Sequence, residues 1–394
     1  MKIYYENNLD NIYMNMKGGG LISEGGYGCI YHPSLTKTGK DTDQSQYVSK
    51  LQVKNFASSN ETKIGLMIKE IFNYINYFAP IISSQTIKIG TFDKKAKNIC
   101  SAYQRNPKQK FVLSKLHYLE GYVLNNYIIQ NLNSRKLFMY LLDCFQHILS
   151  GILKLNNQNI IHFDLKGENI IFNDKLNIPI IIDFGLSIPL KSVESNLKNY
   201  FYIYAPSYYY WPIEVHFLNY IIHINKEPKM ADIEKISKEY VHGHSILHSI
   251  FSKDFINKYE RLCIQILETL LPLSYDKKVK KVLEMASTWD NYSLSVIYLK
   301  YMYYFNVKGF VQNSFIIFFT KLLTQNIHPN YLQRHSIEGT IHSYDSFWYD
   351  EAIHKASNFV EILANLEKTA LQMRNVVLQD IKKERKLKRL ITLS

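Results

Sequence analysis

The chain has 394 residues, of which 46% are hydrophobic and 21% charged, and its formal net charge is +13. This composition excludes an intrinsically disordered chain, and the length exceeds what one hydrophobic core usually supports, so we expect two lobes or domains. No apolar run is long enough for a membrane-spanning helix, and the N-terminal segment MKIYYENNLD lacks the apolar core of a signal peptide. We therefore expect an intracellular protein with no membrane partner.

The cysteines and the excess of basic residues narrow the class of protein further. The four cysteines are scattered without a CxxC pair, which argues against a disulfide framework or a zinc site and favours a reducing compartment. Asn, Ile, Lys and Tyr are all abundant, so we attribute much of the lysine excess to the codon bias of an AT-rich genome. Because no aromatic-basic motif of the kind that reads RNA is present, we do not expect a nucleic-acid partner.

The periodicity of apolar residues divides the chain into segments of different character. Residues 1–20 are polar and end in KGGG, which is typical of a flexible leader. Short strands separated by turns occupy residues 21–113, with one strongly helical stretch at 61–78. Residues 114–345 are mainly helical, and residues 346–394 end in a basic helical extension that we expect to be a solvated face. The pattern predicts a small β-rich lobe followed by a larger helical lobe.

A glycine-rich stretch opens the β-rich lobe. ISEGGYGCIY (22–31) has glycines that let the backbone approach an anion closely, although a plain hairpin turn explains them equally well. Lys50 ends a β-type alternation, and Glu70 follows twenty residues later in the helical stretch. A lysine on a strand and a carboxylate on a helix could pair, which would direct the lysine at phosphates.

Lys50 and Glu70 each have a competitor nearby. Lys54 falls beyond the strand alternation, and we expect it to be solvated. Glu61 stands too early in the predicted helix. The sequence therefore favours Lys50 and Glu70 for this pair.

Charged residues are concentrated in IIHFDLKGENIIF (160–172), between two apolar runs. At the end of a short loop, Asp164 could accept a proton from an incoming hydroxyl, and Lys166 could neutralise charge on a transferring phosphoryl group. Asn169 could reach a metal ion. Asp183, which follows an apolar strand in IIIDFGLS, could hold Mg²⁺ against phosphates, because hard oxygen ligands suit this ion.

The order of these elements resembles the eukaryotic protein kinase family: glycine loop, strand lysine, helix glutamate, HxDLKxxN, and DFG. Three later elements extend the resemblance to residues 21–345. WPIEV supplies Glu214, WDNYSLS supplies Asp290, and HPNYLQRHSIE supplies Arg334. The resemblance implies an α+β, bilobal fold, in which Asp290 bonds the catalytic-loop backbone and Arg334 forms a buried pair with Glu214.

The resemblance also implies a set of site residues and cofactors. Lys50, held by Glu70, would contact the α- and β-phosphates of ATP, while Asn169 and Asp183 would bind Mg²⁺ or Mn²⁺. Asp164 and Lys166 would be the catalytic residues. The adenine would lie against the strand-to-helix linker FVLSKL, and the residue that sets the depth of its pocket would be Leu113, to within one residue. The loop residues implied in nucleotide binding are Ile22, Ser23, Glu24, Gly25, Gly26, Tyr27, Gly28, Cys29 and Ile30.

Three departures from the family pattern matter. Ser23 replaces the first loop glycine, which should weaken phosphate binding only slightly. Phe163 replaces the arginine that usually pairs with a phosphate on the activation loop, so we expect activity without such phosphorylation. The long connection after Glu214 predicts a helical insert at about 220–285. The combination of GGYGCIYHP, WPIEV and the delayed WDNYSLS resembles kinases of large nucleocytoplasmic DNA viruses. Such a protein would act in the host cytoplasm or travel in the virion.

The expected activity is transfer of the γ-phosphate of ATP to serine or threonine hydroxyls of proteins, because Lys166 stands two residues after Asp164 as in serine/threonine kinases. A pseudokinase scaffold is one alternative, although Lys50, Asp164 and Asp183 are all retained. A small-molecule phosphotransferase of kinase-like fold is another, and such proteins lack the elements that contain Glu214 and Arg334.

Overall fold

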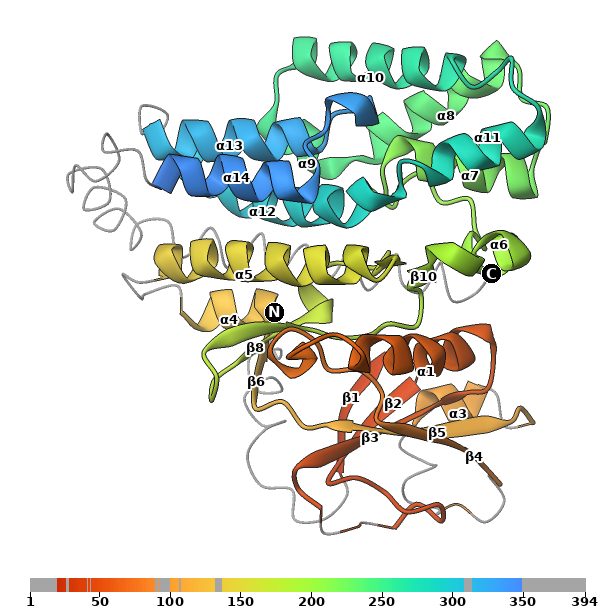
Figure 1. Ribbon diagram of the computed structural model, residues 1–394, viewed down its shortest axis with the longest axis vertical. Helices are drawn as coiled ribbons and strands as arrows, with labels where there is room; N and C mark the ends of the chain where they lie inside the picture. Colours follow the sequence, from red (N-terminus) through yellow and green to blue (C-terminus); the bar gives the residue numbers. More distant parts are fainter. Residues whose placement is uncertain are drawn as a thin grey trace, which may run out of the picture. The chain divides into compact units, whose positions relative to one another are not determined.

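Figure 1 shows the computed structural model of the chain. It describes residues 20–348 apart from 26–27, 41, 43, 89–91, 93–99, 106–107, 132–136 and 308–313. The predicted leader lies outside the described residues except for Gly20, which is the first residue of strand β1. The predicted basic extension also lies outside them, except for the end of the last described helix. Within the described ranges, no helix is both long and apolar enough to cross a membrane.

The chain forms two compact units. Unit 1 contains the chain up to Glu120 together with Asp183–Gly185, and unit 2 contains Gly121–Ile182 and the chain from Leu186 onward. The division therefore falls several residues after the predicted one at 113, because the strand that begins at Phe111 continues to His117. The predicted α+β, two-lobed fold class is confirmed.

Unit 1 is built on a five-stranded antiparallel sheet with the strand order β1-β2-β3-β5-β4. One face of the sheet covers an apolar core that includes Tyr31, Leu51 and Phe111, each fully buried. The elements of this unit are β1 (Gly20–Gly25), β2 (Gly28–His32), β3 (Tyr47–Val53), α1 (Phe56–Lys69), β4 (Ser83–Ile87), α3 (Ser101–Arg105) and β5 (Phe111–His117).

Helix α1 begins three residues after the end of β3. Asn55 caps it, because the side chain of Asn55 accepts a hydrogen bond from the backbone N–H of Ser58. The helix ends at Lys69, and a short 3₁₀ helix at Tyr74–Asn76 follows. The sequence predicted one helix over 61–78, so the observed helix starts and stops earlier than expected.

Unit 2 is mainly helical and carries a three-stranded sheet (β6-β8-β9) and a two-stranded sheet (β10-β7). Its strands are β6 (Gly121–Val123), β7 (Ile160–Ile161), β8 (Ile170–Asn173), β9 (Ile178–Ile181) and β10 (Ile188–Pro189). Its helices are α4 (Leu124–Gln130), α5 (Leu137–Asn157), α6 (Leu197–Tyr200), α7 (Ile213–His223), α8 (Met230–Gly243), α9 (Ser245–Ile250), α10 (Lys253–Glu268), α11 (Tyr275–Leu283), α12 (Trp289–Val307), α13 (Ser314–Asn326) and α14 (Ile337–Trp348).

Aromatic side chains hold four of these helices together. Phe145 of α5 has its ring centroid 4.8 Å from that of Tyr298 on α12 and 5.0 Å from that of Phe319 on α13. Tyr344 of α14 completes the group at 5.4 Å from Phe145. Such rings bury large apolar areas and favour edge-to-face contacts, so this cluster anchors the helices that Figure 1 shows side by side.

The segment predicted as a helical insert is helical. Helices α8 to α11 occupy most of residues 230–283 (green to turquoise in Figure 1), and α10 and α11 are strongly amphipathic. Tyr259 of α10 donates a hydrogen bond to the carbonyl of Ile327, at a distance of 2.7 Å. The segment is therefore packed into unit 2.

Candidate active site

Lys50 is the centre of a buried ionic cluster in unit 1. Its Nζ lies 2.8 and 2.9 Å from the two carboxylate oxygens of Glu61 and 3.0 Å from Oδ1 of Asp183. Gln52 also donates to the carboxylate of Glu61, at 3.2 Å. Burial alone would lower the pKa of Lys50, but the carboxylates of Asp183 and Glu61 outweigh it and raise the pKa above its ordinary value. The ammonium group therefore stays charged.

The predicted partner of Lys50 was wrong, because Glu61 rather than Glu70 makes the ion pair. Helix α1 starts at Phe56, so its first turns pass beside β3, and there the side chain of Glu61 is only 3% exposed. Glu70 is the exposed C-cap residue of the helix. Nine residues of helix correspond to about 13 Å along the axis, which puts Glu70 out of reach.

The preference for Lys50 over Lys54 agrees with the structure. Lys54 lies after the last residue of β3, is exposed, and donates to the hydroxyl of Thr86 at 3.1 Å. Lys50 is 7% exposed and is the lysine of the buried cluster.

The glycine-rich stretch forms the hairpin between β1 and β2. Gly25 and Gly28 are paired across its end, and Gly26 and Tyr27 between them lie outside the described residues. A Cβ at Gly28 would be 2.2 Å from the backbone oxygen of Leu51, so only glycine lets β2 come this close to β3. The packing of the hairpin against β3 is therefore enough to explain the glycine at position 28.

The strand register decides which hairpin residues share a face with Lys50. Ile30 lies directly opposite Lys50 in the sheet, and Ser23 lies opposite Ile30. Residues directly opposite one another point to the same face. Ser23 and Ile30 are therefore on the face of Lys50; Ile22 lies at a register shift, and Glu24 is exposed.

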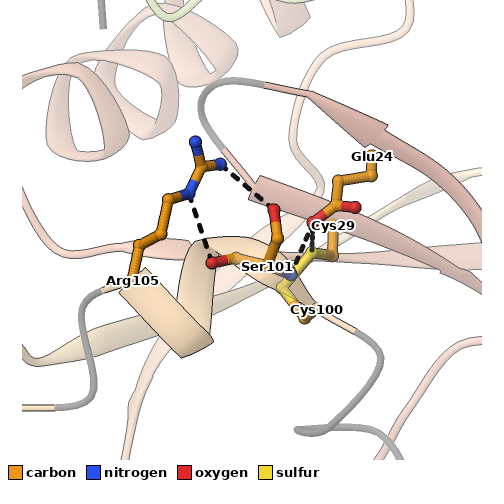
Figure 2. Close-up of a disulfide and its surroundings, with 5 residues drawn as sticks. All are labelled: Glu24, Cys29, Cys100, Ser101 and Arg105. Carbon is orange, nitrogen blue, oxygen red and sulfur yellow. Dashed lines mark hydrogen bonds between the residues drawn. A yellow bond between two sulfur atoms is a disulfide. The ribbon is translucent and has the colours of Figure 1, made fainter. Parts of the chain in front are cut away.

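Cys29 was predicted to line the nucleotide site, and the scattered cysteines argued against a disulfide framework; the structure agrees with neither expectation. It lies opposite Leu51, on the face that points away from Lys50. It also forms a disulfide with Cys100, 71 residues later (Figure 2). Both cysteines are fully buried in the core of unit 1. The sequence hid this bond because the two cysteines are brought together only by the fold.

Glu24 is anchored beside the disulfide. Its Oε1 accepts a hydrogen bond of 2.5 Å from the backbone N–H of Ser101, the first residue of α3. Figure 2 shows this carboxylate next to Cys29 and Cys100. The contact ties the end of β1 to α3, which is a structural role for Glu24.

The residue that sets the depth of the adenine pocket was predicted at Leu113 to within one residue, and the register favours the neighbouring Ser114 over Leu113. FVLSKL is part of strand β5, so it is not a linker. Leu113 lies opposite Leu51 and belongs to the core cluster. Ser114 lies opposite Lys50, and Leu116 lies opposite Val48. Ser114 and Leu116 are therefore on the face of Lys50, as is Val112, which lies opposite Gln52.

Asp164 is the centre of a second cluster, in unit 2. Lys166 donates to both carboxylate oxygens of Asp164 at 2.6 Å, and Asn169 Nδ2 donates to Oδ2 at 3.0 Å. The phenol of Tyr208 donates to Oδ1 at 2.6 Å. All four side chains are almost fully buried. The three predicted residues are thus together, and Tyr208 is a fourth that the sequence did not reveal.

The backbone before Asp164 is held in an unusual conformation. Phe163 has φ of +67°, which is uncommon for a residue with a large side chain. The carboxylate of Asp290 accepts from the N–H groups of His162 and Phe163, at 2.6 and 2.9 Å. Trp211 donates to the carbonyl of Phe163 at 2.7 Å. These contacts offset the conformational cost, which is on the order of 1–3 kcal/mol.

The predicted structural role of Asp290 is confirmed. Asp290 is fully buried, and burial raises the pKa of its carboxyl group although the two N–H donors favour the charged form. His162 is also fully buried, and its Nε2 lies 3.0 Å from the carbonyl oxygen of Ile182. His162 therefore belongs to the core of unit 2.

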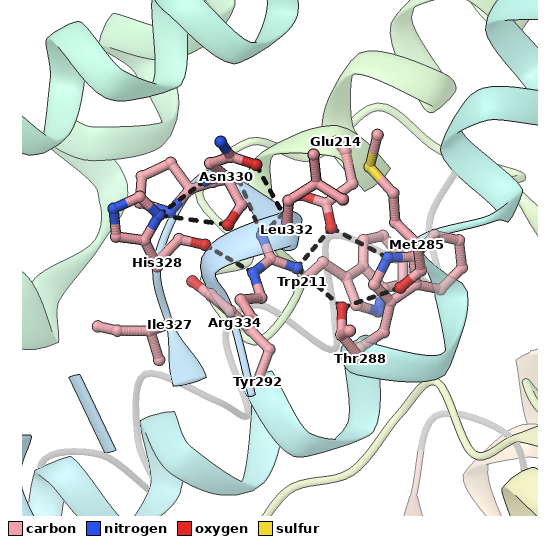
Figure 3. A network of polar contacts seen from close by, with 12 residues as sticks. Trp211, Glu214, Met285, Thr288, Tyr292, Ile327, His328, Asn330, Leu332 and Arg334 are labelled. Atoms are coloured by element: carbon pink, nitrogen blue, oxygen red, sulfur yellow. Dashed lines mark hydrogen bonds and ion pairs between the residues drawn. The ribbon is translucent and has the colours of Figure 1, made fainter. Parts of the chain in front are cut away.

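The predicted pair of Glu214 and Arg334 is present and enclosed (Figure 3). Two nitrogens of Arg334 donate to the two oxygens of Glu214, at 2.6 and 2.9 Å. Arg334 also donates to the hydroxyl of Thr288 and to the carbonyls of His328 and Pro329. Removing one partner of such a pair leaves a buried charge without compensation.

Asp183 and Asn169 each have the chemistry that a divalent cation requires. Asp183 has φ of +65° and a side chain that is 24% exposed, and it makes a buried cluster of one lysine and two carboxylates net negative. The amide nitrogen of Asn169 donates to Asp164, so the amide oxygen is the atom suited to a cation. Carboxylate and amide oxygens fit a hard cation such as Mg²⁺.

Comparison with known proteins agrees with this arrangement. Residues 24–215 match the family model described as "Protein kinase domain". Over this segment the chain is similar to protein kinase domains. Asp290 on α12 and Arg334, which follows the short 3₁₀ helix at Tyr331–Gln333, lie beyond the matched residues.

Two curated relatives are similar to parts of the chain. "Serine/threonine-protein kinase Nek8" of Danio rerio is 32% identical over 111 residues, which are 28% of this chain and 16% of the relative. "Probable serine/threonine-protein kinase fnkB" of Dictyostelium discoideum is 28% identical over 120 residues, which are 29% of this chain and 22% of the relative. The chain thus spans less than a quarter of either relative.

Proposed function

We propose that this protein is an ATP-dependent protein kinase that transfers the γ-phosphate of ATP to serine or threonine hydroxyls of protein substrates. The observation that carries the proposal is that Lys50, Asp164 and Asp183, which a pseudokinase scaffold would be expected to lose in part, are all present and each is held by partners. The names of both relatives support the serine/threonine class.

Each residue of the two clusters has a role in this reaction. Lys50, kept charged and oriented by Glu61, would contact the α- and β-phosphates of ATP. Asp164 would accept the proton of the attacking hydroxyl, and Lys166 would neutralise charge on the transferring phosphoryl group. Asp183 and Asn169 would hold Mg²⁺, which supplies positive charge to the phosphates.

The substrate class and the location of the protein are also part of this proposal. The buried pair of Glu214 and Arg334 supports a platform for a protein substrate over a small-molecule acceptor, because small-molecule phosphotransferases of this fold lack both elements. Intracellular action and the resemblance to kinases of large DNA viruses stay predictions from the sequence. The disulfide of Cys29 does not favour the reducing compartment that the scattered cysteines suggested.

The test is a γ-phosphate transfer assay with casein and histone as generic acceptors. Asp164→Asn should reduce transfer by roughly 10²- to 10⁴-fold, since it removes the proton acceptor. Asp183→Ala should reduce both transfer and binding of MgATP. Lys54→Ala is the matched control and should resemble the wild type, because Lys54 is exposed and contacts Thr86.

Two results would count against the proposal. Equal incorporation by the wild type, Asp164→Asn and Asp183→Ala would reject the mechanism. Absence of transfer by the wild type, with nucleotide still bound, would favour a pseudokinase scaffold.

A further inference from the structure

The segment Asp183–Gly185 belongs to unit 1, although the chain on both sides of it belongs to unit 2. Its first residue, Asp183, has a carboxylate oxygen 3.0 Å from Nζ of Lys50. Its middle residue, Phe184, is 1% exposed, and its ring meets that of Phe78 edge-to-face with centroids 6.0 Å apart. The position of the charged side chain therefore depends on how the rest of this short segment is held.

Asn60 of helix α1 holds the last residue of the segment. Its amide nitrogen donates to the carbonyl of Gly185 at 3.1 Å, and Asn60 is only 3% exposed. A Cβ built on Gly185 would lie 3.8 Å from the backbone oxygen of Ala57 and 3.8 Å from a carboxylate oxygen of Glu61. The segment is thus packed directly against the first two turns of α1, and the amide of Asn60 bonds it there.

The start of α1 acts on both charged partners of Lys50. Glu61 pairs with Lys50 itself, and Asn60, the residue before it, bonds the backbone two residues after Asp183. Successive side chains of a helix point about 100° apart, so two neighbours can reach two different segments. The sequence hid this role of Asn60, because the helix was expected to begin only at residue 61.

Asp183 needs an anchor of this kind for two reasons. Its φ of +65° is uncommon for a residue other than glycine and has a conformational cost. The carboxylates of Asp183 and Glu61 also carry like charges beside one ammonium, which favours their separation, and the side chain of Asp183 is 24% exposed. A neutral amide holds the backbone in place and leaves the net negative charge of the cluster for a cation to complete.

We propose that Asn60 is a positioning residue, which holds Asp183–Gly185 on helix α1 so that Asp183 faces Lys50 before any ligand binds. Its consequence for cation binding rests on the proposed kinase function. A ligand that binds only one of two arrangements loses apparent affinity in proportion to the fraction of protein in that arrangement. Loss of the anchor should therefore weaken binding of MgATP, which uses Asp183, and spare metal-free ATP, which uses Lys50.

The test compares the full-length wild type with Asn60→Leu, which is of similar size but has no donor, and with Asn60→Ala, which admits water to the vacated space. Thr62→Val is the matched control, since the hydroxyl of Thr62 donates within the same helix, to the carbonyl of Ser58 at 3.2 Å. Hydrogen exchange of the ligand-free proteins follows the backbone amides of residues 183–187. Calorimetry gives the Kd of ATP with Mg²⁺ and with EDTA.

We expect the amides of residues 183–187 to exchange up to about tenfold faster in both Asn60 variants, because a hydrogen bond between neutral groups is lost. The amides of α12 should exchange at the wild-type rate, which shows that the fold is intact. The Kd of MgATP should rise by no more than the same factor, and the Kd of metal-free ATP should stay unchanged. Thr62→Val should match the wild type in every measurement.

The outcomes separate this proposal from the proposed function. Unchanged exchange at residues 183–187 in both variants would overturn the role of Asn60. Equal weakening of MgATP and metal-free ATP would also overturn it, since that result indicates a general loss of structure in α1. Faster exchange with an unchanged affinity for MgATP would show that Asp183 needs no anchor. If exchange is faster but the wild type binds no ATP, Asn60 still anchors the segment and the kinase function fails.

Discussion

The Lys50 cluster of unit 1 and the Arg334 cluster of unit 2 are both buried, but their charges are arranged differently. The Lys50 cluster places one ammonium between the carboxylates of Glu61 and Asp183, and the side chain of Asp183 is 24% exposed. The Arg334 cluster pairs one guanidinium with one carboxylate, Glu214, and the two side chains are 1% and 2% exposed.

The difference shows how a functional cluster can be distinguished from an ion pair that stabilises the fold. In the Arg334 cluster the charges balance, and the remaining guanidinium donors bond Thr288 and two carbonyl groups. In the Lys50 cluster one negative charge remains in excess and is partly open to solvent. An excess charge of this kind is costly unless a cation or ligand completes it, so it indicates function where the balanced pair indicates stability.

The largest effect is expected at the balanced pair. Arg334→Met should lower the free energy of unfolding by roughly 3–5 kcal/mol, because Glu214 is left buried and unpaired. Urea denaturation measures this loss. The control is Lys281→Met, which breaks the exposed pair with Glu284 and should leave the denaturation midpoint unchanged. A loss no larger than that of the control would erase the distinction between the two clusters.

A substitution in the Lys50 cluster should change the activity of the protein more than its stability. Glu61→Gln leaves Lys50 paired with Asp183 and removes the excess charge, so the free energy of unfolding should change little. Phosphate transfer should fall roughly tenfold, because Lys50 loses the charged partner that orients it.

Glu70→Gln is the matched control for this prediction, since Glu70 is exposed at the end of the same helix. It should transfer phosphate at the wild-type rate. If Glu70→Gln lost activity and Glu61→Gln kept it, the assignment of the Lys50 partner would be wrong.

The smallest effect is expected from removing phosphate from the segment that precedes Glu214. The ring of Phe163 stacks on Trp211 with centroids 4.7 Å apart and meets Phe201 edge-to-face at 5.6 Å. Phe163 stands where the family has an arginine that pairs with a phosphate, and its ring makes these aromatic contacts instead. Phosphatase treatment should therefore leave the rate of phosphate transfer unchanged, and a required phosphosite between Ser187 and Tyr210 would contradict this.

The sequence predicted best the features that depend on short spacings. Asp164, Lys166 and Asn169 lie within six residues, and a short loop keeps them together whatever the rest of the chain does. The pair of Glu214 and Arg334 was predicted because the order of motifs resembles a known family, although 120 residues separate them. Helix boundaries, and the face of the sheet to which each strand residue points, were predicted less well.

Each error concerned a structural property that the spacing of motifs along the sequence does not specify. Glu61 was passed over because the helix was expected to start at 61, whereas Asn55 caps it and Phe56 begins it. Leu113 was chosen on the wrong face, since a shift of one residue moves a side chain to the opposite side of a sheet. The bond between Cys29 and Cys100 joins β2 to the residue before α3, across 71 residues.

The sequence by itself determined the fold class, the order of the motifs and the residue types that this chemistry needs, because local patterns of hydrophobicity and charge encode them. Only the tertiary structure decided that Glu61 holds Lys50, that Cys29 points away from it, and that Tyr208 reaches Asp164. Those contacts depend on where helices begin, on strand register and on the path of a loop. Such properties are fixed by packing between distant segments, which no local pattern records.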